Sequence, residues 1–263
     1  MPRFIAQGVA DDSAMPSGPE PTIELQRVEC AACMPPCGRC VAALGQYGAA
    51  RMATFPAPAA PLLSAHRLAF SRNDEPVFGP LDFSLGSGET VLVEGDNGSG
   101  KTTLLRVLAG MLPPGEGEIR FSDRAASRDS RNGRILWLGH RPGMNESLSA
   151  CENLDFLTGL YGRRAGVVPV SAMERVGIAG WIDEPLRTLS AGQKKRVGLA
   201  RLLLLPGEVW LLDEPYANLD RHGIDLVNAL ITEHCARGGA ALVTSHGAVR
   251  FADPRARRIH LVA

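Results

Sequence analysis

The sequence predicts an α/β fold in which parallel strands alternate with helices. Three stretches of the 263-residue chain carry this prediction. An apolar, strand-like run at residues 91–93 enters a glycine-rich loop and then a helical pattern at 103–110. Two further apolar runs, 209–212 and 241–243, each end in polar residues. With 45% hydrophobic residues, the chain has enough apolar side chains to build such a core.

The glycine-rich loop at residues 95–102 has the pattern G-x-x-x-x-G-K-T. Its glycines let the backbone wrap a phosphate chain with N–H groups inward, and the following helix points its positive end there. Lys101 is placed to reach the β- and γ-phosphates, and the Thr102 hydroxyl suits Mg²⁺. The alternative, a glycine-rich turn before a core helix, is disfavoured by the flanking strand and helix. The candidate ATP-binding residues are Gly95, Asp96, Asn97, Gly98, Ser99, Gly100, Lys101, Thr102 and Thr103.

Two acidic residues follow the apolar run at 209–212. Asp213, at the strand end, is the candidate to hold Mg²⁺ together with Thr102. Glu214 is the candidate general base that polarises the attacking water, and His246 is placed to contact the γ-phosphate. A solvated strand end and a structural histidine are the alternatives for these residues. The glycine-rich loop earlier in the chain favours the catalytic interpretation.

The order and spacing of five motifs resemble the nucleotide-binding domain of ATP-binding cassette (ABC) proteins. They are the glycine-rich loop, LSAGQ at 189–193, WLLDEP at 210–215, Asp220 and His246, and the resemblance covers residues 62–263. It implies two cassettes in a homodimer that sandwiches two ATP molecules head to tail. The signature residues of one chain then contact the γ-phosphate held by the other, and Asp220 belongs to the D-loop. The signature residues are Ser190, Ala191, Gly192 and Gln193.

Ser190 has a second interpretation that needs no partner chain. Serine is a preferred N-cap residue, so Ser190 can cap the apolar-periodic helix predicted at 194–205. A capped helix start also leaves backbone N–H groups that bind anions. The N-cap and the phosphate contact are therefore both open for this residue.

The resemblance implies a P-loop NTPase fold with a RecA-like parallel core, a flanking antiparallel β-subdomain and a small helical subdomain. Short apolar runs between 62 and 93 suggest the antiparallel sheet. Residues 148–176 look helical, and the helical subdomain is expected at about 145–195. Phe70 is the candidate to stack on the adenine base. A place among the apolar residues of the flanking sheet is its equally weighted alternative.

Residues 1–61 differ in composition from the rest of the chain. Proline, glycine, alanine and serine are scattered without a helical or strand period, which favours a disordered extension. The segment carries four of the six cysteines, Cys30, Cys33, Cys37 and Cys40. Their paired spacing suggests a metal site, but the gap between pairs is shorter than zinc ribbons use. A true start at Met52 is an alternative that would remove the segment.

Charge and hydropathy narrow the classes of partner. The formal net charge is zero, so no basic field for nucleic acid is expected. No stretch offers about 20 uninterrupted apolar residues for a membrane span, and residues 1–10 lack a signal-peptide core. The expected location is the cytoplasmic face of a membrane, with any attachment made by partner subunits.

Two segments narrow the resemblance further. WLGHRPG at 137–143 and LSACENL at 148–154 are similar to ABC subunits of cytochrome c maturation and haem export. This implies a bacterial inner-membrane complex with cytochrome c maturation proteins B, C and D as integral membrane partners. ATP hydrolysis there drives release of a haem-loaded chaperone. Arg141 stands where the family has a glutamine that contacts Mg²⁺, and an arginine cannot ligate a metal.

Other functions remain open at this point. The chain can instead serve another ABC exporter that moves a drug, peptide or lipid. A soluble ABC protein of translation or repair is disfavoured, because the chain has one glycine-rich loop and no long heptad insertion. A metal-binding role of the four N-terminal cysteines is a separate possibility.

Overall fold

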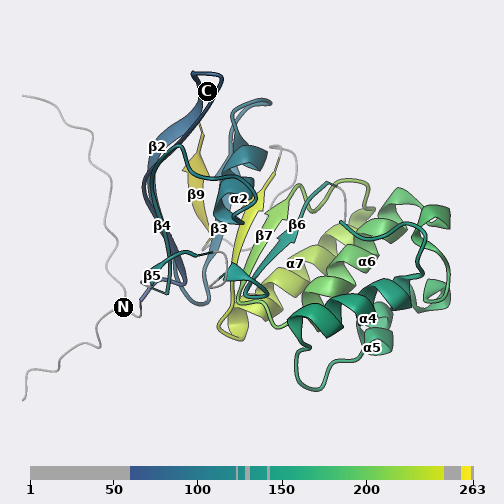
Figure 1. Ribbon diagram of the computed structural model, residues 1–263. Helices are drawn as coiled ribbons and strands as arrows, with labels where there is room; N and C mark the ends of the chain where they lie inside the picture. Colours follow the sequence, from purple (N-terminus) through teal and green to yellow (C-terminus); the bar gives the residue numbers. More distant parts are fainter. Residues whose placement is uncertain (1–59, 123, 128–130, 141–142, 246–255, 262–263) are drawn as a thin grey trace, which may run out of the picture. The chain divides into compact units, whose positions relative to one another are not determined.

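The computed structural model describes residues 60–122, 124–127, 131–140, 143–245 and 256–261 (Figure 1). The N-terminal cysteines, Met52, Arg141 and His246 lie outside the described residues. Within them, the chain forms one parallel and one antiparallel sheet with helices, which is the predicted α/β architecture.

The parallel sheet has the strand order β6-β7-β8-β3-β9. Every neighbouring pair in it runs parallel. The strands are short, and all but the edge strand β9 are largely apolar, as expected for strands covered on both faces. The strands are β3 (Thr90–Glu94), β6 (Ile135–Leu138), β7 (Val209–Asp213), β8 (Ala240–Thr244) and β9 (Arg257–His260).

The antiparallel sheet has the order β2-β1-β4-β5 and matches the predicted flanking subdomain. Its first two strands form a hairpin whose turn residues, Asn73 and Asp74, have φ angles of 51° and 65°. Asparagine and aspartate tolerate this left-handed conformation, which tight hairpin turns require. The strands are β1 (Leu63–Arg72), β2 (Glu75–Leu85), β4 (Glu116–Phe121) and β5 (Arg124–Ala125).

Alternating side chains of the parallel strands supply two separate cores. On β7, Trp210 and Leu212 join one core, whereas Val209 and Leu211 join the other. The first core packs helices α4, α5, α6 and α7 against one face of the sheet. The second encloses α2 between the parallel and antiparallel sheets, and Figure 1 shows the helices divided in this way. The helices are α2 (Lys101–Leu108), α4 (Ala150–Tyr161), α5 (Pro169–Arg175), α6 (Ala191–Leu204) and α7 (Arg221–Ala236).

The helical subdomain differs in detail from the sequence prediction. The continuous helical pattern expected at 148–176 is two helices, because Gly162, with a φ of 79°, ends α4 and Pro169 begins α5. Two 3₁₀ turns, η1 (Ala179–Trp181) and η2 (Leu186–Thr188), then lead to α6. Among the described residues, no helix has the length and apolar character to cross a membrane.

Candidate nucleotide-binding site

Three central strands of the parallel sheet end side by side. Val93 of β3 pairs with Thr244 of β8, which also pairs with Asp213 of β7. The carboxyl ends of parallel strands lie at one edge of the sheet, where α/β folds bind their ligands. The topology therefore brings the glycine-rich loop, the acidic pair and the end of β8 to one edge.

The backbone of the glycine-rich loop needs glycine at two positions. Gly95 has a φ of 150°, and a Cβ atom there would lie 2.5 Å from the Leu261 carbonyl oxygen. Gly100 has a φ of 87° and starts α2, and a Cβ atom there would lie 2.9 Å from the Val77 carbonyl oxygen. Side chains at these positions would push the loop away from strands β2 and β9.

Lys101 folds back over its own loop. Its Nζ donates to the carbonyl oxygens of Gly95 at 2.6 Å and Asp96 at 2.7 Å. Lys101 is only 5% exposed, so these two hydrogen bonds satisfy a largely buried ammonium group. Nearby in the loop, the buried Ser99 hydroxyl has no hydrogen-bond partner among the described residues. A buried polar atom without a partner, in a loop of this shape, fits a ligand that supplies one.

Asp213 and Thr102 meet at the start of α2. The Thr102 hydroxyl lies 3.1 Å from Oδ1 and 2.9 Å from Oδ2 of Asp213. On the other side, the Thr244 hydroxyl donates to Asp213 Oδ1 at 2.9 Å. These are hard oxygen donors, the type that Mg²⁺ prefers, so the residues present fit the predicted metal.

Glu214 follows in an unusual backbone conformation. Its φ of 48° lies in the left-handed region, which non-glycine residues seldom adopt. Its N–H donates to the Thr244 hydroxyl at 3.0 Å, and its carbonyl accepts from Ala217 N at 3.2 Å. The same carbonyl accepts from the Nζ of Lys195, on α6, at 3.1 Å. Hydrogen bonds to its N–H and to its carbonyl oxygen, one on each side of the Cα, therefore fix the backbone of Glu214.

A hollow of about 400 Å³ opens beside this network. The predicted residues Thr102, Asp213 and Glu214 line it, together with Trp137 and His140. Trp137 and His140 belong to the segment 137–143 that carried the family resemblance, but no role in the site was predicted for their side chains. Thr244 and Lys195 were not predicted as part of the site either. Thr244 ends an apolar run, whereas Lys195 stands between two other basic residues and carries no distinguishing signal.

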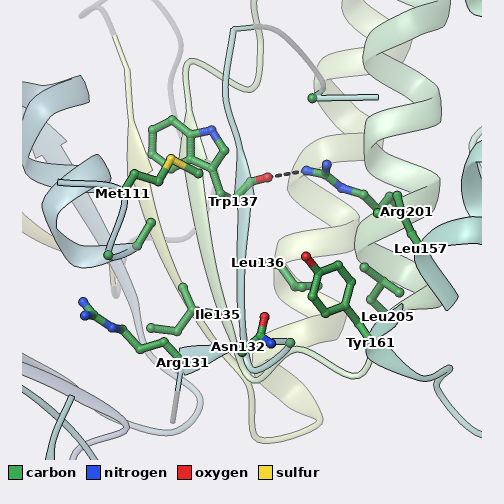
Figure 2. A pocket seen from close by; sticks show the side chains of 14 residues that line it. Met111, Arg131, Asn132, Ile135, Leu136, Trp137, Leu157, Tyr161, Arg201 and Leu205 are labelled. Atoms are coloured by element: carbon green, nitrogen blue, oxygen red, sulfur yellow. Dashed lines mark hydrogen bonds between the residues drawn. The ribbon is translucent and has the colours of Figure 1, made fainter. Parts of the chain in front are cut away.

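A larger hollow of about 680 Å³ lies along β6 and is also lined by residues of α4 and α6. Trp137 and Met111 line both hollows, and Figure 2 shows Met111 beside the Trp137 indole. Arg201 donates to the Trp137 carbonyl oxygen, and burial lowers the pKa of Arg201 to about 10. Arg201 therefore remains charged at neutral pH.

The signature residues form the start of α6. The Ser190 hydroxyl accepts from Gln193 N at 3.2 Å, and Gln193 Oε1 accepts from Ser190 N at 2.8 Å. This capping box confirms the predicted N-cap, and it starts the helix at Ala191, three residues before the predicted start. A Cβ atom on Gly192 would lie 2.9 Å from the Asn218 carbonyl oxygen, so the helix start packs closely on the segment between β7 and α7.

Two other predicted residues have local structural partners. Asp220 caps α7 by accepting from Gly223 N at 2.8 Å, and it lies 3.5 Å from Arg196 of α6. Phe70 is half-buried, and its ring stacks on that of Phe78 with centroids 6.2 Å apart. Neither contact tests the roles expected from the resemblance, so D-loop and adenine contacts stay predictions.

We expect Thr244→Val to destabilise the protein. Valine has nearly the same shape as threonine, but it can neither accept the hydrogen bond from Glu214 N nor donate one to Asp213. Both of these hydrogen bonds are at least partly buried. Leaving such groups without partners costs about 1–3 kcal/mol, which lowers the melting temperature by about 2–12 °C. Thermal unfolding measures this. Thr232→Val, which removes an exposed hydroxyl on α7, is the control. An unchanged melting temperature for Thr244→Val would contradict the network.

Comparison with known proteins agrees with this geometry. The sequence model of the ABC transporter family matches residues 78–217. The cytochrome c biogenesis ATP-binding export protein CcmA of Xanthomonas oryzae pv. oryzae is 58% identical over 205 residues, which cover 78% of this chain and 96% of that protein. The protein of the same name from Escherichia coli K12 is 39% identical over 203 residues, covering 76% and 96%.

Solved structures show the same fold. A putative ABC transporter ATP-binding protein from Pyrococcus furiosus superposes with a TM-score of 0.65 at 26% identity, covering 76% of this chain and 96% of that one. The ATP-binding cassette MJ0796, solved as a dimer with ADP and phosphate, superposes with a TM-score of 0.66 at 21% identity. The match covers 76% of this chain and 94% of that one.

The fold, the glycine-rich loop and the family match define an ATP-binding cassette. The chain belongs to the ABC transporter family, and within it to the cytochrome c biogenesis ATP-binding export proteins named CcmA.

Proposed function

We propose that this chain is the ATP-hydrolysing subunit of a bacterial ABC complex for haem export in cytochrome c biogenesis. The observation that carries the ATPase part is the convergence of Lys101, Thr102 and Asp213 at one edge of the sheet. The identity to relatives named for cytochrome c biogenesis supports the choice of pathway.

In this proposal, the loop N–H groups and the start of α2 hold the phosphates of ATP. Lys101 exchanges its loop carbonyl partners for phosphate oxygens, which carry more negative charge. Thr102 and Asp213 would hold Mg²⁺, which would supply positive charge to balance the β- and γ-phosphates. Phe70 stacks on the adenine.

Hydrolysis then needs a positioned water. The oxygen of the water attacks the γ-phosphorus while Glu214 accepts a proton from that water. The bond between the γ-phosphorus and the oxygen that joins it to ADP then breaks. His246 contacts the γ-phosphate and helps orient the water. The products are ADP and inorganic phosphate.

The complex that we propose contains two cassettes arranged head to tail. Ser190, Ala191, Gly192 and Gln193 of one chain then face the γ-phosphate held by the other, with the D-loop residue Asp220 alongside. The exposed position of Ser190 at a helix start supports this role. The membrane partners are cytochrome c maturation proteins B, C and D, which hold the cassettes at the cytoplasmic face of the inner membrane. ATP hydrolysis releases a haem-loaded chaperone.

Isolation from membranes tests the pathway. An affinity-tagged full-length chain, expressed in a bacterium that makes c-type cytochromes, should retain cytochrome c maturation subunits and hydrolyse ATP. Co-purification with the permease of a drug, peptide or lipid exporter would instead support the second candidate. An isolated complex without ATPase activity would contradict both.

We also propose that residues 1–51 are dispensable. Both described cores are built from side chains at position 62 and beyond, so a chain that begins at Met52 keeps every one of them. Its ATPase rate should be within about twofold of the full-length rate. Loss of folding, or loss of a metal bound by the full-length chain, would show instead that the four N-terminal cysteines matter.

A further inference from the structure

Lys195 is a buried basic residue close to the acidic pair Asp213 and Glu214. It lies on α6, five residues after Ser190, and is only 5% exposed. Gly198 and Leu199, which follow three and four residues later on the same face of the helix, are also buried. Burial lowers the pKa of Lys195, and the negative charges of Asp213 and Glu214 oppose part of this shift. A buried ammonium group is costly, so its position calls for a specific explanation.

The contact that Lys195 makes is with the backbone of Glu214. Its Nζ donates to the Glu214 carbonyl oxygen at 3.1 Å, while Thr244 on β8 accepts from the Glu214 N–H at 3.0 Å. The two peptide groups that flank the Glu214 Cα are thus tied to two different elements. Because the φ of Glu214 is 48°, this residue needs such support to keep its side chain in a fixed direction.

The contact is not needed to satisfy the carbonyl. Ala217 N already donates to the same oxygen at 3.2 Å, within the turn that follows β7. The bond from Lys195 is therefore additional to the one that this carbonyl already has. What Lys195 adds is a charged link between α6 and the residue that carries the candidate general base.

We propose that Lys195 is a positioning residue for ATP hydrolysis, which links the signature helix α6 to the backbone of Glu214. The inference rests on the proposed function of Glu214. Helix α6 begins at Ala191, directly after its N-cap Ser190, where the opposing nucleotide would dock. Movement of that helix shifts the anchor of Glu214, so the carboxylate is aligned on water only when α6 is in its docked position.

The first experiment compares Lys195→Met with Lys194→Met in the full-length chain assembled with its membrane partners. Methionine keeps the length and volume of lysine but cannot donate. Lys194 is the matched control, because its Nζ pairs with Glu146 at 3.1 Å instead of approaching the acidic pair. We expect Lys195→Met to lower kcat about ten- to a hundredfold, as small misplacements of a reacting group do. KM for ATP should change less than about twofold, and the melting temperature should not fall.

The second experiment asks whether Lys195 acts through Glu214. In single-turnover measurements, Lys195→Met should add less than about a twofold loss to a Glu214→Gln background, because coupled residues are not additive. Lys195→Arg, which keeps a cation and donors, should recover part of the lost kcat.

Three results would overturn the inference. One is a normal kcat for Lys195→Met in a complex whose wild type hydrolyses ATP. Another is a full additive loss in the Glu214→Gln background. The last is an equal loss for Lys195→Met and Lys195→Arg with a lowered melting temperature, which would assign Lys195 to the fold alone. A wild-type complex that does not hydrolyse ATP would instead contradict the proposed function itself.

Discussion

Glu214→Gln should bind ATP normally and lose nearly all hydrolysis. Glutamine keeps the shape of the side chain and leaves the backbone bonds to Thr244 and Lys195 unchanged. It cannot accept a proton from water, and losing a general base costs about 10²–10⁴-fold in rate. Steady-state release of phosphate measures the loss, and binding of a fluorescent ATP analogue checks the nucleotide site.

The same variant should accumulate as an ATP-bound dimer, because the closed state no longer decays by hydrolysis. Size-exclusion chromatography with and without ATP detects this change. Glu208→Gln is the control, since Glu208 sits at the opposite end of β7, paired with Arg134 at 2.7 Å. Turnover close to the wild-type rate in Glu214→Gln would remove Glu214 from the proposed role.

Most of the parallel sheet could be predicted, because its strands other than β9 are continuous apolar runs. The apolar run at 209–212 is strand β7, which ends at Asp213 as expected, and the run at 241–243 lies within strand β8. Runs of this kind bury both faces, so local sequence and tertiary position agree. The N-cap at Ser190 could also be predicted, because it depends only on neighbouring residues at the start of the helix.

The features that sequence reasoning missed depend on contacts between distant segments. Lys195 lies 19 residues before Glu214 on a different element, and only the packing of α6 against β7 brings them together. Thr244 reaches Asp213 across 31 residues of sequence, because β7 and β8 are neighbours in the sheet. The split between α4 and α5 is different, because its signals are local: Gly162 ends α4 and Pro169 begins α5.

The head-to-tail dimer leads to a prediction about two residues acting in different sites. In the proposed arrangement, Lys101 serves the ATP bound by its own loop, whereas Ser190 serves the ATP of the opposing chain. Lys101→Ala and Ser190→Arg homodimers therefore each have a lesion in both sites. Removing such phosphate contacts should lower the ATPase rate by several orders of magnitude, on the scale of about 10³-fold.

A heterodimer of the two variants should recover activity. One of its sites carries both lesions, and the other carries the intact Lys101 and the intact Ser190. If the sites fire independently, a heterodimer isolated through two different affinity tags should hydrolyse ATP at about half the wild-type rate. The measurement compares this heterodimer with both homodimers and the wild type, each assembled with the membrane partners.

The alternative arrangement makes the opposite prediction. If Ser190 served the ATP of its own chain, each site of the heterodimer would carry one lesion and no activity would return. Thermal unfolding of Ser190→Arg separates a lost phosphate contact from a lost helix cap, because the cap contributes about 1 kcal/mol and its loss shifts the melting temperature only slightly. A Ser190→Arg homodimer that hydrolyses ATP normally would refute the signature role and remove the main support for the head-to-tail dimer.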